Sequence, residues 1–356
     1  MKGVTPGGID CDVHPAVPGM AALLPYLDDY WREQVVTRGI DGLGLASFPP
    51  GIAANGRADW RPPKGLPGGD LEMLRAQALG AFGTKAAICN PLYGVQALHN
   101  PHFATALARA MNDWMAAEWL DREPRLRASI VIAPQDPEQA VAEIDRRASD
   151  RRFVQVLLLA MGETLLGKRV HWPIYAAAER HGLPIGIHAG STAHHATTGN
   201  GWPSYYIEDY AAQAQAFQAQ LLSLVHEGVF VKYPGLTVVL IESGFTWLPG
   251  FMWRANKTWR GVRAEVPWVD RPPAELIRDH VRVTLQPTDA PPDAASLEKV
   301  IDQIGSDRML LFSTDYPHWH FEGMKAFPAG FPAGLKQRVL VDNPLATYPR
   351  LKETLQ

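Results

Sequence analysis

The sequence has few cysteines and little net charge, and each shortage excludes a class of protein. Only Cys11 and Cys89 occur in 356 residues, and both lie in apolar runs. This argues against a disulfide scaffold and against a cysteine-based zinc site. The formal net charge is -3, with 34 basic residues interspersed among 37 acidic ones. We therefore expect no surface for nucleic acid or for an anionic membrane.

The sequence also lacks the segments that direct a chain to or across a membrane. It has no charged N-terminal start followed by an apolar stretch. No apolar run approaches the length of a bilayer-spanning helix. With 46% apolar and 20% charged residues, the composition is that of an ordinary globular protein. We expect a cytoplasmic protein that binds a small-molecule substrate.

Short apolar runs recur along the chain and indicate buried parallel strands. Most of them are continuous rather than alternating, which is typical of strands covered on both faces. The eight runs are Ile9–Val13, Ala86–Cys89, Ala128–Ile132, Phe153–Leu159, Ile185–His188, Leu236–Ile241, Val281–Leu285 and Met309–Phe312.

The stretches between these runs have helical patterns, so the chain alternates between strand and helix. Asp136 followed by Pro137 and Gln139 is one clear helix start. Eight such units predict an α/β fold, a distorted (β/α)8 TIM barrel. The rival, an open nucleotide-binding sheet, needs a glycine-rich turn after its first strand, and none is present there. We predict one domain over residues 1–356, with an inserted loop at about 45–70 that is either a lid or substrate-facing loop or a floppy insertion on the surface.

The first predicted strand carries acidic and imidazole groups on one side. Alternate residues of a strand face the same way, so Asp10, Asp12 and His14 point together. Functional groups of a (β/α)8 barrel project from the C-terminal ends of the strands. The three side chains are therefore candidates for a metal or proton-transfer site.

Three later strands also end in metal-ligand residues: the fifth in His188, the sixth in Glu242 and the eighth in Asp315. Carboxylates that converge at one barrel mouth repel each other unless a cation binds between them. Two histidines with carboxylates form a ligand set for zinc, iron or manganese. We predict one or two divalent ions, zinc first, held by Asp12, His14, His188, Glu242 and Asp315.

Other polar residues are weaker candidates for this site. The residues that could contact substrate are His171, His318, His320 and Arg254, together with His194 and His195. The two histidines after Asp315 could instead ligate a second metal. Tryptophans recur on the expected helix after Glu242, where core packing or a subunit interface is the usual role.

The motifs at these strand ends resemble those of the amidohydrolase superfamily, in the branch that includes aminocarboxymuconate-semialdehyde decarboxylase. The resemblance covers nearly the whole chain. The matching pieces are Ile9-Asp10-Cys11-Asp12-Val13-His14-Pro15, Leu183-Pro184-Ile185-Gly186-Ile187-His188, Ser313-Thr314-Asp315-Tyr316-Pro317-His318 and Asn343-Pro344-Leu345-Ala346. It implies a barrel with a metal at its mouth, and His14, His188 and Asp315 match the family ligands by position.

Two positions depart from the family pattern. Asp12 stands where the family has the first histidine of His-x-His, and Glu242 stands where it has the strand-six histidine. The predicted site therefore has harder ligand atoms and more negative charge, which favours iron or manganese and leaves room for a second metal. In its carboxylate-rich ligand set the site is similar to that of a small branch of the superfamily, the non-haem di-metal oxygenases. This branch includes a two-subunit α-aminoisobutyrate hydroxylase.

Three functions follow as hypotheses. The first is a metal-dependent hydrolase or decarboxylase of a small carboxylate, with Asp315, His188 and Glu242 as catalytic residues and Asp315 as general base by resemblance. The second is an iron or manganese oxygenase, alone or as one subunit of a pair. The third is a non-catalytic partner subunit stabilised by its metal. We expect a homo-oligomer or a hetero-oligomer with a related subunit.

Overall fold

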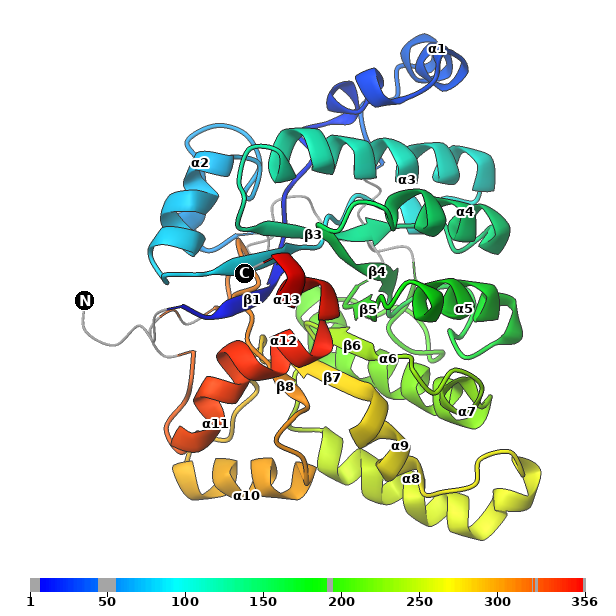
Figure 1. The fold of residues 1–356 in the computed structure, drawn as a ribbon, viewed down its shortest axis with the longest axis vertical. Coiled ribbons are helices and arrows are strands. Elements are labelled where there is room, and N and C mark those ends of the chain that lie inside the picture. The colour runs from blue at the N-terminus through cyan, green and yellow to red at the C-terminus, as the bar shows by residue number, and fades with distance from the viewer. Residues whose placement is uncertain (1–6, 44–55, 191–194, 322, 324–325, 355–356) are drawn as a thin grey trace.

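Eight parallel strands stand side by side in sequence order, β1 to β8, with helices around them (Figure 1). The computed structural model describes residues 7–43, 56–190, 195–321, 323 and 326–354. The strands are β1 Ile9–Val13, β2 Ala86–Cys89, β3 Leu126–Val131, β4 Phe153–Leu159, β5 Ile185–His188, β6 Val238–Ile241, β7 Val281–Thr284 and β8 Leu310–Leu311. The predicted TIM barrel is confirmed, with shifts of one or two residues at some strand ends.

Helices α1 to α10 lie between consecutive strands, and α11 to α13 follow the last strand. They are α1 Asp29–Arg38, α2 Leu71–Leu74, α3 Pro101–Met115, α4 Pro137–Arg147, α5 Trp172–Arg180, α6 Tyr206–His226, α7 Val229–Lys232, α8 Leu248–Val262, α9 Pro273–His280, α10 Ala294–Ile304, α11 Ala333–Gln337, α12 Asn343–Thr347 and α13 Pro349–Thr354. The predicted start of α4 is confirmed, because Asp136 accepts a hydrogen bond from the Gln139 amide at 3.1 Å.

Backbone hydrogen bonds close the barrel between its first and last strands. The Cys11 amide donates to the Phe312 carbonyl at 2.9 Å, and the His14 amide donates to the Tyr316 carbonyl at 2.7 Å. The Asp315 amide donates back to the Asp12 carbonyl at 3.0 Å. The ends of β1 and β8 are thereby fixed against each other, and with them the side chains of Asp12, His14 and Asp315.

The last helix closes the end of the barrel at which the strands begin. Arg350, almost fully buried on α13 (red in Figure 1), donates to the Phe153 carbonyl at the start of β4, at 2.8 Å. The Tyr348 hydroxyl, just before this helix, donates to Gln155 inside the barrel at 3.2 Å. Access to the interior is therefore left to the opposite end, where the strands finish.

The inserted segment predicted at 45–70 is described from residue 56 onward, and residues 45–55 lie outside the described ranges. Its described part lies against the backbone of the barrel mouth. The Ala16 amide donates to the Gly68 carbonyl at 3.0 Å, and the Arg57 amide donates to the Pro317 carbonyl at 2.8 Å. A Cβ on Gly68 would collide with the His14 carbonyl, so glycine permits this close approach.

The loop after β4 is held by α6, and this contact provides a stability prediction. The Gly167 amide donates to Ser223 Oγ at 3.1 Å, and a Cβ at Gly167 would collide with the Ser223 backbone. We expect Gly167→Ala to lower the free energy of unfolding by about 1–3 kcal/mol, measured by chemical denaturation. Gly162→Ala, in the same loop with open space around it, is the matched control. Equal denaturation midpoints for Gly167→Ala and Gly162→Ala would contradict the close packing of Gly167 against Ser223.

No helix within the described ranges is both long and apolar enough to cross a bilayer.

Candidate metal centre

Four of the predicted ligands meet at the mouth of the barrel: Asp12, His14, His188 and Asp315. One ligand atom from each lies within 4.8 Å of the others, and all four side chains are buried. His14 Nε2 lies 2.7 Å from Asp315 Oδ1 and 3.2 Å from Asp12 Oδ1. His188 Nε2 lies 3.6 Å from Asp12 Oδ2. We call this group the mouth cluster.

Backbone hydrogen bonds fix which ring nitrogen of each histidine faces the cluster. His14 Nδ1 donates to the Asn90 carbonyl, and His188 Nδ1 donates to the Ala189 carbonyl, both at 2.8 Å. A carbonyl only accepts, so each Nδ1 carries the proton and each Nε2 offers its lone pair when the ring is neutral. Histidines that bind a metal are usually oriented in this way.

Besides Asp315 Oδ2, which is paired with His320, two atoms of the mouth cluster are buried without a hydrogen-bond partner among the described residues. They are Asp12 Oδ2 and His188 Nε2, which face each other at a distance too long for a hydrogen bond. A buried polar atom left unpaired is costly, whereas a cation bound between the two would satisfy both. The donor set of two imidazoles and two carboxylates therefore fits a divalent metal.

The charges in the mouth cluster are strongly coupled. Burial alone would raise the pKa of Asp12, but the imidazoles of His14 and His188 outweigh it and hold that pKa well below its usual range. Burial likewise opposes the ionised form of Asp315, while His318 and His320 lower its pKa further than burial raises it. Both carboxylates are therefore ionised, which is the form that binds a metal.

A second group of ligand atoms overlaps the first: His14, Glu242, Asp315 and His318. His318 Nδ1 lies 2.7 Å from Asp315 Oδ1, and Glu242 Oε2 lies 3.5 Å from His188 Nε2. His320 Nε2 is paired with Asp315 Oδ2. Glu242 and both late histidines therefore lie around the mouth cluster, in the positions where sequence analysis sought a second metal or a substrate contact.

Tyr210, on α6, was missed by the sequence analysis. Its hydroxyl lies 2.8 Å from Glu242 Oε1, to which it donates, and 2.9 Å from His320 Nδ1. One hydroxyl therefore holds two side chains that arrive from β6 and from the segment after β8. A tyrosine in a helical pattern gives no signal of such a role.

The backbone is strained where two of these carboxylates sit. Glu242 has φ 59° and Asp315 has φ 54°, both in the left-handed region that non-glycine residues rarely adopt. Such strain costs of the order of 1–3 kcal/mol per residue and clusters at functional sites. Among the described residues these are the two non-glycine positions with positive φ, and both face the mouth.

A chain of buried side chains continues from the mouth cluster into the barrel. Asn90 Nδ2 donates to Asp12 Oδ1 at 2.8 Å, and Asn90 Oδ1 accepts from Ser129 at 2.5 Å and from Gln155 at 3.0 Å. Gln155 in turn accepts from Tyr348. This polar chain fixes the orientation of Asp12. Its sequence signal was a polar residue inside an otherwise apolar strand run, as with Ser129 and Gln155.

The remaining sequence candidates lie away from the mouth cluster. Asp10 faces the interior, where its carboxylate accepts from the Thr314 amide and hydroxyl, and burial raises its pKa to about 7. His171 and His195 line a separate cavity. Arg254 is exposed on α8, and its role as a substrate clamp stays a prediction. His194 lies outside the described residues.

Comparison with known proteins agrees with this geometry. A family profile described as amidohydrolase matches residues 9–350, from the first strand into the last helix. The chain belongs to the amidohydrolase family. The resemblance noted in the sequence motifs is thereby confirmed, and the amidohydrolase barrel of this chain carries Asp12 and Glu242 at two positions of its mouth.

The amidohydrolases similar to this chain include decarboxylases. Gamma-resorcylate decarboxylase of Rhodococcus jostii strain RHA1 is 27% identical over 242 residues, 63% of this chain and 70% of the relative. A dihydroxybenzoic acid decarboxylase from Polaromonas sp. JS666, solved with manganese and 2-nitroresorcinol, has a TM-score of 0.67 at 20% identity, covering 97% of both chains. A manganese complex of 5-carboxyvanillate decarboxylase from Novosphingobium aromaticivorans DSM 12444 has a TM-score of 0.70 at 20% identity, covering 97% of this chain and 96% of that one.

Proposed function

We propose that this amidohydrolase is a metal-dependent decarboxylase of small aromatic carboxylates. The observation that carries the proposal is the mouth cluster, in which two oriented imidazoles and two ionised carboxylates leave Asp12 Oδ2 and His188 Nε2 without hydrogen-bond partners among the described residues. The relatives named as decarboxylases, and the manganese in two of their structures, support this reaction class. Manganese suits the oxygen-rich donor set better than the zinc that the sequence first suggested.

Asp12, His14, His188 and Asp315 would hold the metal. When bound, the metal supplies positive charge that orients the substrate carboxylate and stabilises negative charge. The side chains of the protein exclude water and hold the groups around the metal in place. Burial of the mouth cluster keeps bulk water from the reacting group, and Tyr210 keeps Glu242 and His320 in place.

Decarboxylation exchanges a carboxylate for a proton. The bond between the ring and the carboxylate breaks, carbon dioxide leaves, and the electron pair left on the ring carbon takes up a proton. We assign its delivery to Asp315, which is surrounded by His14, His318 and His320. His318 has 24% of its side chain exposed and contacts Asp315 Oδ1, so it can pass protons from solvent to that carboxylate.

Release of carbon dioxide without oxygen is the test of the proposed reaction. The manganese-loaded protein should convert a dihydroxybenzoate or a carboxyvanillate into the ring without its carboxylate, at equal rates in air and under nitrogen. Carbon dioxide and the phenolic product are quantified together. Substrate-dependent oxygen uptake, with no carbon dioxide released, would reject decarboxylation.

The oxygenase alternative retains one specific observation in its favour. The second ligand group, with Glu242 and His318, offers places for another ion beside the mouth cluster. An oxygenase of this type would carry about two iron or manganese ions per chain and consume oxygen with its substrate. Metal content at one ion per chain, with no oxygen uptake, would remove this alternative.

Tyr210 provides a prediction that tests the surroundings of the metal centre. Tyr210→Phe removes the hydroxyl that holds Glu242 and His320 but keeps the ring. We expect turnover to fall about 10–100-fold, as for other residues that orient metal ligands, while the melting temperature changes little. Tyr30→Phe, at an exposed tyrosine on α1, is the control. Unchanged turnover in Tyr210→Phe would show that the reaction does not depend on the hydrogen bonds of Tyr210 to Glu242 and His320.

A further inference from the structure

A cavity of about 300 Å³ opens at the ends of β3 and β4. Gln96, Gln135, Leu159, Met161 and His171 are among the residues that line it. Leu159 pairs in register with His188 on the neighbouring strand. The cavity therefore belongs to the same end of the barrel as the mouth cluster, although no cluster residue lines it. Its volume is that of a small-molecule site.

Two polar groups in the wall of this cavity lack partners. His171 is 6% exposed, and neither ring nitrogen has a hydrogen-bond partner among the described residues. Gln96 Nε2 donates to the Leu157 carbonyl at 2.6 Å, but Gln96 Oε1 is buried without a donor. Leaving such groups unpaired destabilises a folded protein. Two of them on one cavity indicate that a bound molecule completes their hydrogen bonds.

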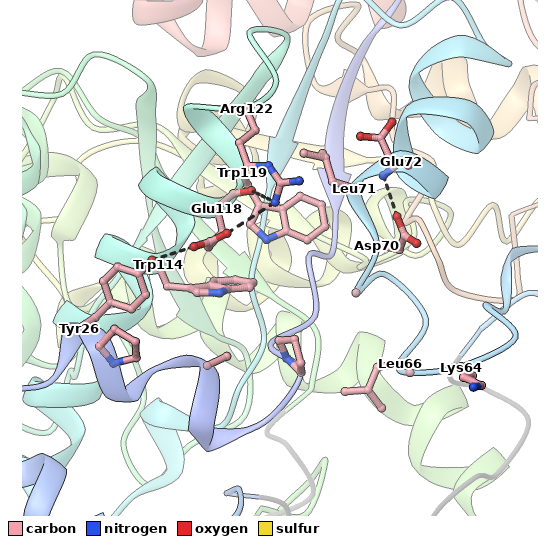
Figure 2. Close-up of a pocket in the computed structure, with 15 residues that line it drawn as sticks. Tyr26, Lys64, Leu66, Asp70, Leu71, Glu72, Trp114, Glu118, Trp119 and Arg122 are labelled. Atoms are coloured by element: carbon pink, nitrogen blue, oxygen red, sulfur yellow. Dashed lines mark hydrogen bonds and ion pairs between the residues drawn. The ribbon is translucent and has the colours of Figure 1, made fainter.

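A larger cavity elsewhere in the protein differs in that polar groups in its wall are paired with one another. It has a volume of about 540 Å³ and lies between α2 and the end of α3 with the residues that follow it (Figure 2). Its polar groups satisfy one another: Tyr26 donates to Glu118 at 3.1 Å, and Glu118 pairs with Arg122 at 3.6 Å. The Asp70 carboxylate caps α2 by accepting from the Glu72 amide at 2.8 Å. Volume alone therefore does not produce unpaired polar groups in this fold.

We propose that the cavity lined by His171 and Gln96 is a second ligand site, for a small uncharged molecule that offers both a hydrogen-bond donor and an acceptor. Phenols and carboxamides are the simplest members of this class. Gln96 Oε1 requires a donor from the ligand, and the His171 ring can accept one hydrogen bond and donate another. Leu159, Met161 and Pro134 provide apolar surface for the body of the molecule.

An uncharged ligand is favoured by the state of His171. Burial lowers the pKa of this imidazole, so it is neutral at physiological pH and offers no positive charge to a carboxylate. In the same wall His99 Nδ1 lies 3.3 Å from Glu163 Oε1, and both side chains are solvent-exposed. This site thus differs from the mouth cluster, which has the chemistry to bind an anion through a metal.

Binding of benzamide, with benzoate as its charged counterpart, tests the proposal without any measurement of turnover. We expect benzamide to bind about tenfold more weakly to His171→Phe and to Gln96→Leu than to the unmodified protein. Benzoate should bind at least about tenfold more weakly than benzamide at this site. Titration calorimetry gives the affinities, and a crystal soaked with benzamide locates the molecule.

Two comparisons separate this site from the metal centre and from loss of folding. The His188→Ala variant, which disrupts the mouth cluster, should retain its affinity for benzamide. His171→Phe should melt at the same or a higher temperature, because it removes a buried polar group that has no partner. His102→Phe, at an exposed histidine on α3, should bind like the unmodified protein. Equal affinity in His171→Phe, or a soaked crystal with benzamide elsewhere, would overturn the proposal.

Discussion

His188→Ala is expected to lose its metal and with it all measurable turnover. The His188 side chain is fully buried at the end of β5, and its Nε2 has no hydrogen-bond partner among the described residues. Alanine would remove one of the two imidazoles of the mouth cluster. Residues that only orient a ligand change metal affinity about 10–100-fold, so loss of a ligand should cost at least about 100-fold. Elemental analysis after gel filtration measures the result.

Two further measurements make the His188→Ala result decisive. His181→Ala, at a partly exposed histidine that pairs with Asp145 on the surface, should keep its metal and its turnover. Thermal denaturation of both variants excludes global unfolding as the cause. If His188→Ala still carried about one tightly bound ion per chain, the mouth cluster would not be the metal site.

Asp315→Asn is expected to separate catalysis from metal binding. Asparagine keeps the size of the side chain and tolerates the left-handed backbone at this position, so the local conformation should persist. The amide cannot receive and deliver the proton that the proposed reaction requires. Turnover should therefore fall about 10²–10⁴-fold, the range attributed to a positioned acid or base.

The metal content of Asp315→Asn should fall less than that of His188→Ala, because the amide oxygen remains a possible ligand. Asp307→Asn, at an exposed aspartate that pairs with Arg338, serves as the control. A loss of turnover smaller than tenfold would show that Asp315 does not handle the proton, and His318 would become the residue to test.

The strands and the ligand cluster were predictable because both depend on local patterns. Continuous apolar runs marked the strands, and a run such as Ile185–His188 ended where the observed strand ends. Parallel strands place their C-terminal ends on one edge, so His14, His188 and Asp315 had to approach one another once the barrel was assumed. Their sequence separation of up to 301 residues was no obstacle to this inference.

The residues that surround the cluster could not be found in the same way. Tyr210 lies 32 residues before Glu242 and 110 before His320, and its place depends on how α6 is rotated over the mouth. A helical pattern indicates which face is buried but not which residue at its start reaches a particular carboxylate. The unpaired state of His171 depends in the same way on the paths of the four loops, after β2, β3, β4 and β5, that line its cavity.

The polar chain inside the barrel joins the start of α13 to the mouth cluster by hydrogen bonds. Tyr348 stands only two residues before Arg350, and through Gln155 and Asn90 it is joined by hydrogen bonds to Asp12. A change that displaces α13, such as a partner fused tightly against it, would loosen a support on which Asp12 relies. Preparations that differ only in a C-terminal tag should therefore be compared for their metal content before their activities are compared.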